Sequence, residues 1–152
     1  MYNFLVPFFA AFILTFVQMP FVIKLAKKMG FIDVPKDGRR VHNKPIPVGG
    51  GIAMVISVTI LMLVFLKLDK ALIMAIISSL IIAFSGLYDD KYDLSPKLKF
   101  GFQILAAIVL ICGGMKIEFF TNPFDSQDAL FILNMLSIPV TIFWVCGITN
   151  TI

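Results

Sequence analysis

Residues 71–88 read Ala-Leu-Ile-Met-Ala-Ile-Ile-Ser-Ser-Leu-Ile-Ile-Ala-Phe-Ser-Gly-Leu-Tyr, a run without a charged side chain. A helix of this length rises by about 27 Å, close to the roughly 30 Å thickness of a bilayer's hydrocarbon core. The run is followed directly by Asp89 and Asp90. The sequence therefore predicts a membrane helix with an acidic pair at its end.

The composition of the whole chain agrees with this prediction. Of the 152 residues, 59% are hydrophobic and only 14% are charged, and the mean hydropathy is +0.96. A soluble domain carries about 25% charged residues. We therefore expect an integral membrane protein. Its net charge of +4 comes from residues beside apolar runs, so nucleic acid is not an expected partner.

Four further apolar stretches are long enough to be spanning candidates, namely residues 4–23, 49–66, 100–115 and 129–152. The first has no basic leader before it, so we expect a retained helix and not a signal peptide. No polar tail or basic anchor follows Ile152, which suggests a truncated sequence. We expect an all-α, polytopic membrane protein with five transmembrane helices in one domain, residues 1–152.

The basic residues predict how these helices are oriented. Ten of the thirteen Lys and Arg residues fall in or beside the first and third connections, and three, Lys67, Lys70 and Lys116, fall in the other two. Basic residues favour the cytoplasmic side. The N-terminus is therefore expected outside, and connections 26–48 and 89–95 are expected in the cytoplasm.

The composition of the connections predicts their structure. Connection 26–48 contains Pro35, Pro45 and Pro47, which argue against a continuous helix. The connection after residue 115 begins Lys-Ile-Glu-Phe-Phe, which permits a short strand or hairpin.

The start of the fourth helix is expected to attract an anion. Ser95 suits the N-cap and Pro96 the first helical position. Lys97 and Lys99 then fall in the first turn, where positive charge is unfavourable by about 0.3 kcal/mol or more unless an anion lies nearby.

The acidic pair is the other half of this candidate site. An ionised Asp at the membrane centre costs about 2.5–3.5 kcal/mol, so Asp89 and Asp90 must lie at the interface or in a wet cavity. A solvated helix end is the ordinary interpretation of such a pair. The neighbouring lysines instead favour a site for a divalent metal and a phosphate, with Asp93 as a minor candidate.

The first connection offers a second set of polar residues. The segment 38–44 reads Gly-Arg-Arg-Val-His-Asn-Lys and is followed by glycines at positions 49–51. Its basic residues are also explained by membrane topology alone. His42 is the only histidine, so a metal site built from several histidines is excluded.

Three motifs together resemble a known family. Asp89 to Gln103, the loop from Phe31-Ile-Asp-Val-Pro through Arg40-Val-His to Pro47-Val-Gly-Gly, and Gly147-Ile-Thr-Asn150 are similar to the polyprenyl-phosphate N-acetylhexosamine-1-phosphate transferases, glycosyltransferase family four. The Arg40-Val-His loop resembles the branch that uses UDP-N-acetylglucosamine, whereas the phospho-N-acetylmuramoyl-pentapeptide branch has a different loop there.

The resemblance implies a Mg²⁺-dependent enzyme, with Mn²⁺ as a substitute, of about ten membrane helices, often dimeric, in the bacterial cytoplasmic membrane. It would transfer N-acetylglucosamine-1-phosphate from the UDP-sugar to undecaprenyl phosphate and release UMP, initiating teichoic acid, O-antigen or similar cell-envelope glycans. The chain matches the front half, which implies that residues 1–152 alone are inactive.

Site roles follow from the motifs and the resemblance together. Asp89 and Asp90 are expected to hold the metal or orient the lipid phosphate, and the resemblance also permits one as a base. Substrate contacts are expected from Lys97, Lys99, Asp33, Arg40, His42, Lys44 and Asn150. Two alternatives remain open: a non-catalytic membrane subunit or remnant, and an ion or proton transporter, although transport sites usually place acidic groups near the midplane.

Overall fold

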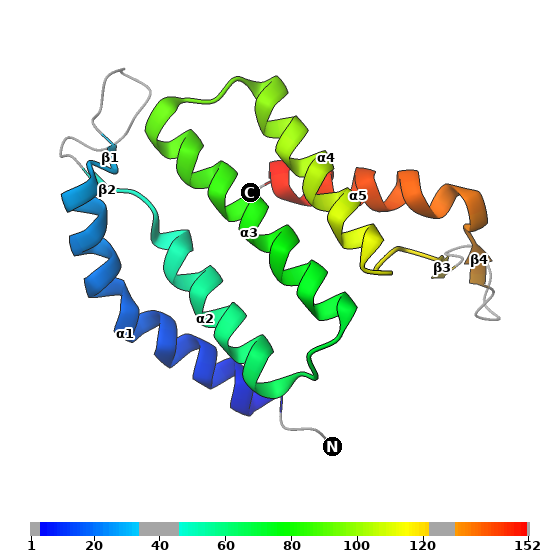
Figure 1. Ribbon diagram of the computed structural model, residues 1–152, viewed down its shortest axis with the longest axis horizontal. Coiled ribbons are helices and arrows are strands. Elements are labelled where there is room, and N and C mark those ends of the chain that lie inside the picture. The colour runs from blue at the N-terminus through cyan, green and yellow to red at the C-terminus, as the bar shows by residue number, and fades with distance from the viewer. Residues whose placement is uncertain (1–3, 34–45, 122–129, 152) are drawn as a thin grey trace. The chain divides into compact units, whose positions relative to one another are not determined.

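The computed structural model describes residues 4–33, 46–121 and 130–151, and these residues are mostly helical (Figure 1). The helices are α1 Leu5–Met29, α2 Gly50–Phe65, α3 Lys70–Tyr92, α4 Pro96–Cys112 and α5 Ser137–Thr151, with a 3₁₀ turn η1 at Asn134–Leu136. Two antiparallel ribbons accompany them, β1 Ile32–Asp33 with β2 Ile46–Pro47, and β3 Phe119–Thr121 with β4 Leu130–Ile132.

Two of the described helices, Leu5–Met29 and Lys70–Tyr92, are long and apolar enough to cross a membrane. Gly50–Phe65 is apolar but shorter. A mostly helical membrane protein is thus consistent with the structure, while the count of five spans and the outside N-terminus stay predictions.

The chain divides into two compact units, and the first contains Met1–Leu68 with Ala83–Ser95. Here α1 and α2 lie side by side (Figure 1). Small residues permit this close packing, since Ala53 and Ser57 of α2 are fully buried. The Gln18 amide donates a hydrogen bond of 3.2 Å to the Ser57 hydroxyl, which in turn donates to the Ala53 carbonyl.

The end of α1 is fixed by a left-handed glycine. Gly30 has φ 74°, a conformation that suits glycine at a helix C-terminus. The Phe31 N–H then donates to the Ala26 carbonyl, and the Phe31 carbonyl accepts from the Val48 N–H. Phe31 thereby ties the end of α1 to the residues that lead into α2.

The second unit contains Asp69–Ile82 and Pro96–Ile152. The Asp69 carboxylate caps α3 by accepting from the Leu72 N–H at 2.7 Å. The Ser78 hydroxyl donates to the Ala106 carbonyl of α4 at 2.9 Å, and Ala106 itself is fully buried. The Ser78 bond therefore joins α3 to α4 within this unit.

Several boundaries differ from the sequence-based predictions. α1 continues through the basic residues to Met29, and α3 continues to Tyr92, so Asp89 and Asp90 lie within its last turn and not beyond it. The expected start of the last helix at residue 129 is wrong, because Leu130–Ile132 pairs with Phe119–Thr121 and α5 begins only at Ser137. Between them Asn134 has φ 42°, which interrupts a right-handed helix.

Other predictions are confirmed. α4 begins at Pro96, directly after Ser95, and the connection after residue 115 contains the β3–β4 hairpin. The connection predicted as a loop over residues 26–48 begins as helix and has the β1–β2 ribbon near its ends, a non-local pairing that local composition does not reveal.

Candidate functional site

Asp90 lines a cavity of about 330 Å³ in the first unit. The other walls come from residues 48–52 at the start of α2, from Val55, and from Ala83, Gly86 and Leu87 of α3. Asp90 is exposed, while Asp89 is half-buried. The cavity, called the Asp90 cavity below, thus joins an acidic side chain to the glycine-rich start of α2.

The glycines shape this cavity. Gly49 has φ 102°, which is strained for any L side chain, and a Cβ there would lie 3.6 Å from the Leu87 side chain. A Cβ on Gly51 or Gly86 would meet nothing within 4 Å. Their missing side chains therefore leave open space along the walls that face Asp90.

The electrostatics of the cavity combine opposite charges. α2 has no side-chain hydrogen bond at its N-cap and no acidic residue in its first turn. Its N-terminus carries a partial charge of roughly +0.5. An anionic group is favoured by this helix end and a cation by Asp90, so the cavity suits a phosphate that has a cation as its partner.

Asp89 and Asp90 have different surroundings. One carboxylate oxygen of Asp89 accepts a hydrogen bond of 2.9 Å from the Leu94 N–H, and the Asp89 carbonyl accepts from the Asp93 N–H. Adjacent residues of a helix point in different directions. Asp89 therefore closes the turn after α3, where Asp93 has φ 49°, while Asp90 lines the cavity.

The carboxylate of Asp90 is compatible with a divalent metal that takes its other ligands from water and substrate. Among the described residues, no group of three His, Cys, Asp or Glu side chains could hold an ion by itself. Mg²⁺ usually binds through one or two carboxylates, with water and substrate phosphates completing its shell. Asp90 beside an electropositive helix end fits that pattern better than it fits an all-protein cage.

The two lysines of α4 belong to the second unit. Both lie in the first turn after Pro96; Lys97 is exposed and Lys99 is half-buried. Their expected role towards a diphosphate stays a prediction.

Asn150 is also in the second unit, near the end of α5. Its side-chain nitrogen Nδ2 donates a hydrogen bond of 2.7 Å to Oε1 of the Gln103 side chain, and its Oδ1 accepts one of 3.2 Å from Nε2 of Gln103. A further bond reaches the Cys146 carbonyl at 2.8 Å. In this structure Asn150 thus joins α4 to α5, and its expected contact with substrate stays a prediction.

The remaining predicted residues come from the first connection. Arg40, His42 and Lys44 lie outside the described residues. Asp33 belongs to β1, where it is paired with Ile46 of β2.

One polar residue near the site was missed from the sequence. The Lys91 ammonium lies 5.0 Å from the centre of the Phe31 ring and 5.5 Å from that of Tyr92. The sequence does show an aromatic face near Lys91, because Phe84, Tyr88 and Tyr92 are spaced four residues apart and lie along one face of α3.

Comparison with known proteins gives consistent results. Residues 72–152 match the model of glycosyl transferase family 4. One relative is a probable undecaprenyl-phosphate N-acetylglucosaminyl 1-phosphate transferase of Bacillus subtilis, which is 35% identical to this chain. The alignment covers the whole chain and 42% of the relative. An undecaprenyl-phosphate alpha-N-acetylglucosaminyl 1-phosphate transferase of Pasteurella multocida is 28% identical to this chain. That alignment covers 66% of the chain and 28% of the relative.

A decaprenyl-phosphate N-acetylglucosaminephosphotransferase of Mycolicibacterium smegmatis is 28% identical over 92% of the chain and 36% of the relative. The chain thus spans less than half the length of these relatives. No solved structure gives a significant match. The family match and the similarity over the full chain lead to one conclusion: the chain belongs to glycosyl transferase family 4.

Proposed function

We propose that the full-length protein transfers N-acetylglucosamine-1-phosphate from UDP-N-acetylglucosamine to undecaprenyl phosphate and releases UMP. The observation that carries this proposal is Asp90 in one cavity with the glycine-rich N-terminus of α2. The names of the relatives supply the substrate class. The product would initiate a cell-envelope glycan such as teichoic acid or O-antigen, at the cytoplasmic face of a bacterial membrane.

The reaction is a displacement at phosphorus. An oxygen of the acceptor phosphate forms a bond to the phosphorus that carries the sugar, and the bond from this phosphorus to the bridging oxygen of UMP breaks. A phosphate monoester has its second pKa near 6, so the acceptor is mostly dianionic at neutral pH. Bringing two anions together is therefore a larger obstacle than removing a proton.

The magnitudes indicate what the site must supply. Two unit charges 4 Å apart repel by about 4 kcal/mol at an effective dielectric constant of 20. A helix N-terminus stabilises an anion by about 0.3–2 kcal/mol. The N-terminus of α2 alone thus cannot offset the repulsion between the two phosphate groups. A divalent cation held at Asp90 would neutralise the remaining negative charge. Asp89 would add a second negative charge one residue away and keep the following turn in place.

The proposal extends to the other predicted residues. Lys97 and Lys99 are proposed to bind the donor diphosphate, and Asp33, Arg40, His42, Lys44 and Asn150 to contribute to donor recognition or to the metal and diphosphate region. Mg²⁺, with Mn²⁺ as a substitute, is the proposed cofactor. A homodimer is the proposed assembly.

The test is a reconstituted reaction. Full-length protein in detergent, with Mg²⁺, UDP-N-acetylglucosamine and undecaprenyl phosphate, is expected to release UMP and form a lipid-linked diphosphate sugar. Chelation should stop both products, and Mn²⁺ should restore them. Absence of lipid-linked sugar from folded protein under these conditions would contradict the transferase proposal and favour a non-catalytic subunit.

Lys99→Ala tests donor binding separately. We expect a higher KM for UDP-N-acetylglucosamine with the same amount of protein in the membrane. Unchanged donor kinetics would remove Lys99 from the site.

A further inference from the structure

Apolar side chains are exposed around the β3–β4 hairpin. Phe119 and Ile132 are paired across the two strands, and they are 57% and 71% exposed. Residues directly opposite each other in an antiparallel pair have their side chains on the same face. Met135 follows in η1, where it is 92% exposed. Together with Leu136 and Ile138, which are also exposed, these residues form a surface that we call the hairpin patch.

We propose that the hairpin patch binds the bilayer itself, at the level of the lipid headgroups and the first carbons of the acyl chains. The hairpin would thereby anchor the connection between α4 and α5 in the membrane surface that lies away from Lys97. The proposal takes α4 as one of the predicted spans, and it does not depend on the transferase reaction.

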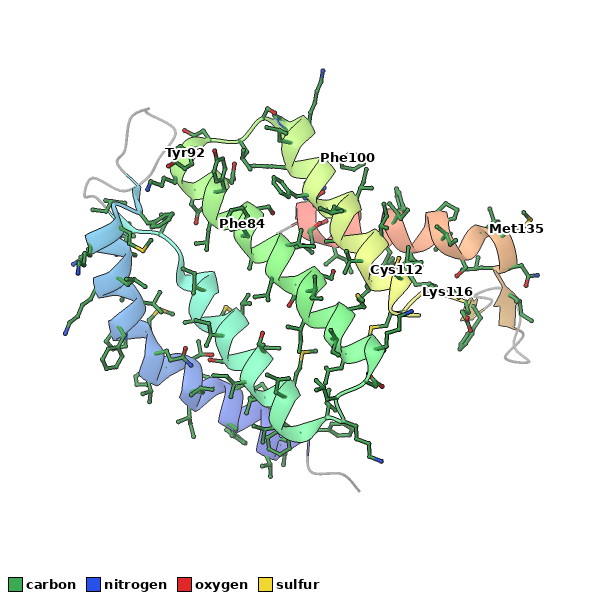
Figure 2. The ribbon with its side chains drawn as sticks, in the orientation of Figure 1. Phe84, Tyr92, Phe100, Cys112, Lys116 and Met135 are labelled. Atoms are coloured by element: carbon green, nitrogen blue, oxygen red, sulfur yellow. The ribbon has the colours of Figure 1, made fainter. Side chains whose placement is uncertain are left out.

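The length of α4 indicates why this connection meets lipid. Its uncharged part, from Phe100 to Cys112, rises by about 20 Å, whereas the hydrocarbon core of a bilayer is about 30 Å thick. Figure 2 shows Phe100 near one end of α4, Cys112 at the other, and Lys116 just beyond it. With the lysines of the first turn at one surface of this core, Cys112 ends about 10 Å short of the other. The residues that follow α4 must therefore cover the remaining thickness.

The backbone beyond α4 has the partners that such a depth requires. Where water is scarce, backbone N–H and C=O groups must be paired within the protein. The Ile117 N–H donates to the Thr141 hydroxyl at 2.9 Å, and the Ile117 carbonyl accepts from the Ser137 hydroxyl at 2.7 Å. The Leu133 N–H donates to the Glu118 carbonyl at 2.8 Å. Side chains of α5 and the hairpin itself thus take the place of water at the base of the hairpin.

The charged residues limit how deep the hairpin can lie. The Lys116 ammonium is 3.4 Å from a carboxylate oxygen of Glu118, and both side chains are exposed. Charged groups are costly in the hydrocarbon core, whereas the headgroup layer accepts them. Among the described residues this ribbon has two strands only, and the outer edges of such a ribbon offer backbone groups that need water or headgroups. Both features favour the interfacial layer.

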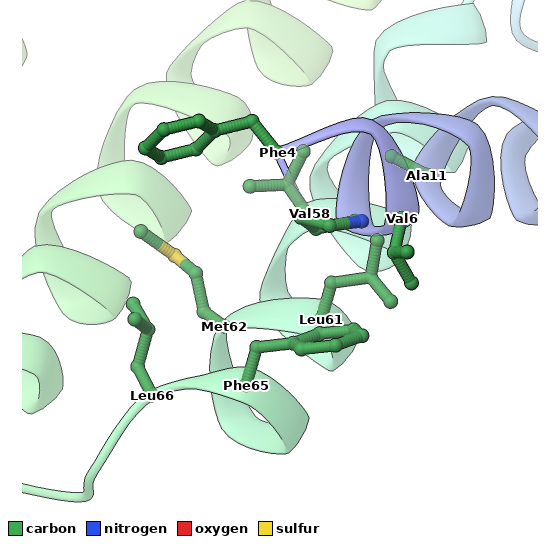
Figure 3. Close-up of a pocket in the computed structure, with 9 residues that line it drawn as sticks. Phe4, Val6, Ala11, Val58, Leu61, Met62, Phe65 and Leu66 are labelled. Atoms are coloured by element: carbon green, nitrogen blue, oxygen red, sulfur yellow. The ribbon is translucent and has the colours of Figure 1, made fainter. Parts of the chain in front are cut away.

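An apolar surface alone does not identify what covers it. The cavity of about 730 Å³ between α1 and α2 (Figure 3) is lined by apolar residues such as Val58, Leu61 and Phe65, so its lining does not distinguish a lipid chain from another helix. At the hairpin patch, the length of α4, the paired backbone and the neighbouring ion pair all indicate the same depth. A second copy of the chain and the remainder of the full-length protein are the competing occupants.

The first experiment measures contact with lipid. Variants of the full-length protein with one accessible cysteine, and with Cys112 and Cys146 replaced, carry the fluorophore NBD in lipid nanodiscs. Met135→Cys is expected to lose most emission when the lipid has bromines near the headgroup end of its chains, and less when they lie near the methyl end. Leu105→Cys, at an exposed position in the middle of α4, should show the opposite order. Glu118→Cys is the exposed control within the hairpin connection and should be quenched least.

The second experiment measures access to water. Nanodiscs expose both membrane faces to a charged maleimide, which should alkylate Met135→Cys at least about tenfold more slowly than Glu118→Cys, because the reacting thiolate forms less readily away from water. The described residues leave Met135 almost fully exposed, so they do not themselves shield it. If Met135→Cys fails to accumulate, Ile132→Cys provides the same comparison on the ribbon.

Each competing occupant gives a different pattern. Water around the hairpin gives fast alkylation of Met135→Cys without quenching by brominated lipid. A protein cover gives slow alkylation without quenching, and protection that declines on dilution into excess lipid identifies a second copy. Any of these patterns would overturn the proposal, as would absence of quenching at Leu105→Cys, because α4 would then not span the bilayer. Absence of transferase activity in the same samples would count against the proposed function and not against the hairpin patch.

Discussion

The two units of the chain use polar residues in different ways. In the first, the Gln18 amide joins α1 to α2 through the Ser57 hydroxyl, and Asp90 at the end of α3 lines a cavity. In the second, buried Gln103, Ser137 and Thr141 make hydrogen bonds to other elements or to the hairpin connection. We propose that the open space beside Asp90 serves binding, whereas the hydrogen bonds of the second unit hold its helices together.

The largest effect is expected within the first unit, at one of the two adjacent carboxylates that end α3. Asp90→Asn is expected to lower kcat by at least about 100-fold, since charge at a phosphoryl-transfer site is usually worth that much. Asp89→Asn keeps an oxygen that can accept from Leu94 and should lose much less activity. Initial rates of UMP release at saturating substrates measure both. If Asp89→Asn is the more damaging change, the assignment of Asp90 as the residue facing substrate is wrong.

The next test concerns the close packing of the second unit. A Cβ on Gly113 would lie 2.7 Å from the Met74 Cβ and 3.0 Å from the Leu110 carbonyl oxygen, so Gly113→Ala should destabilise the protein by about 1–3 kcal/mol through overpacking. Gly101→Ala is the control, because a Cβ there meets nothing within 4 Å and alanine favours the helix by about 0.8–1 kcal/mol. Denaturant titration in detergent should rank Gly101→Ala above wild type and Gly113→Ala below it.

A smaller effect is expected at the amide pair. Asn150→Ala should lower the unfolding free energy by about 1–2 kcal/mol, because it leaves the buried Gln103 amide without its partner. Gln103→Ala should cost less, because the exposed Asn150 amide keeps its bond to the Cys146 carbonyl. The double variant should cost less than the sum of the two, with a coupling near the roughly 0.6 kcal/mol typical of polar pairs in membrane proteins. Additive losses would show that the pair contributes no mutual stabilisation.

The smallest effect is expected in the first unit. Ser57→Ala removes the hydroxyl that accepts from Gln18 and donates to Ala53, and it should cost about 0.6 kcal/mol. A loss as large as that in Asn150→Ala would contradict the weak contribution expected of the Ser57 hydroxyl.

Local sequence signals were sufficient for part of this structure. The apolar run of α3 and the Ser95-Pro96 start of α4 are encoded by neighbouring residues. The start of α5 was missed because Leu130–Ile132 is as apolar as a membrane helix, and only its pairing with Phe119–Thr121 shows it to be a strand. The different surroundings of Asp89 and Asp90, and the position of Lys91 over Phe31, depend on helix phase and on residues far apart in sequence.

The β1–β2 ribbon has a consequence for how the sequence can vary. The pairs Ile32–Pro47 and Asp33–Ile46 bring the two ends of a connection together, and the Phe31–Val48 bond holds them beside α1. Doubling the length of a closed loop costs only about 0.6 kcal/mol. Residues can therefore be inserted, deleted or exchanged between the paired ends at little cost to the stability of the helices.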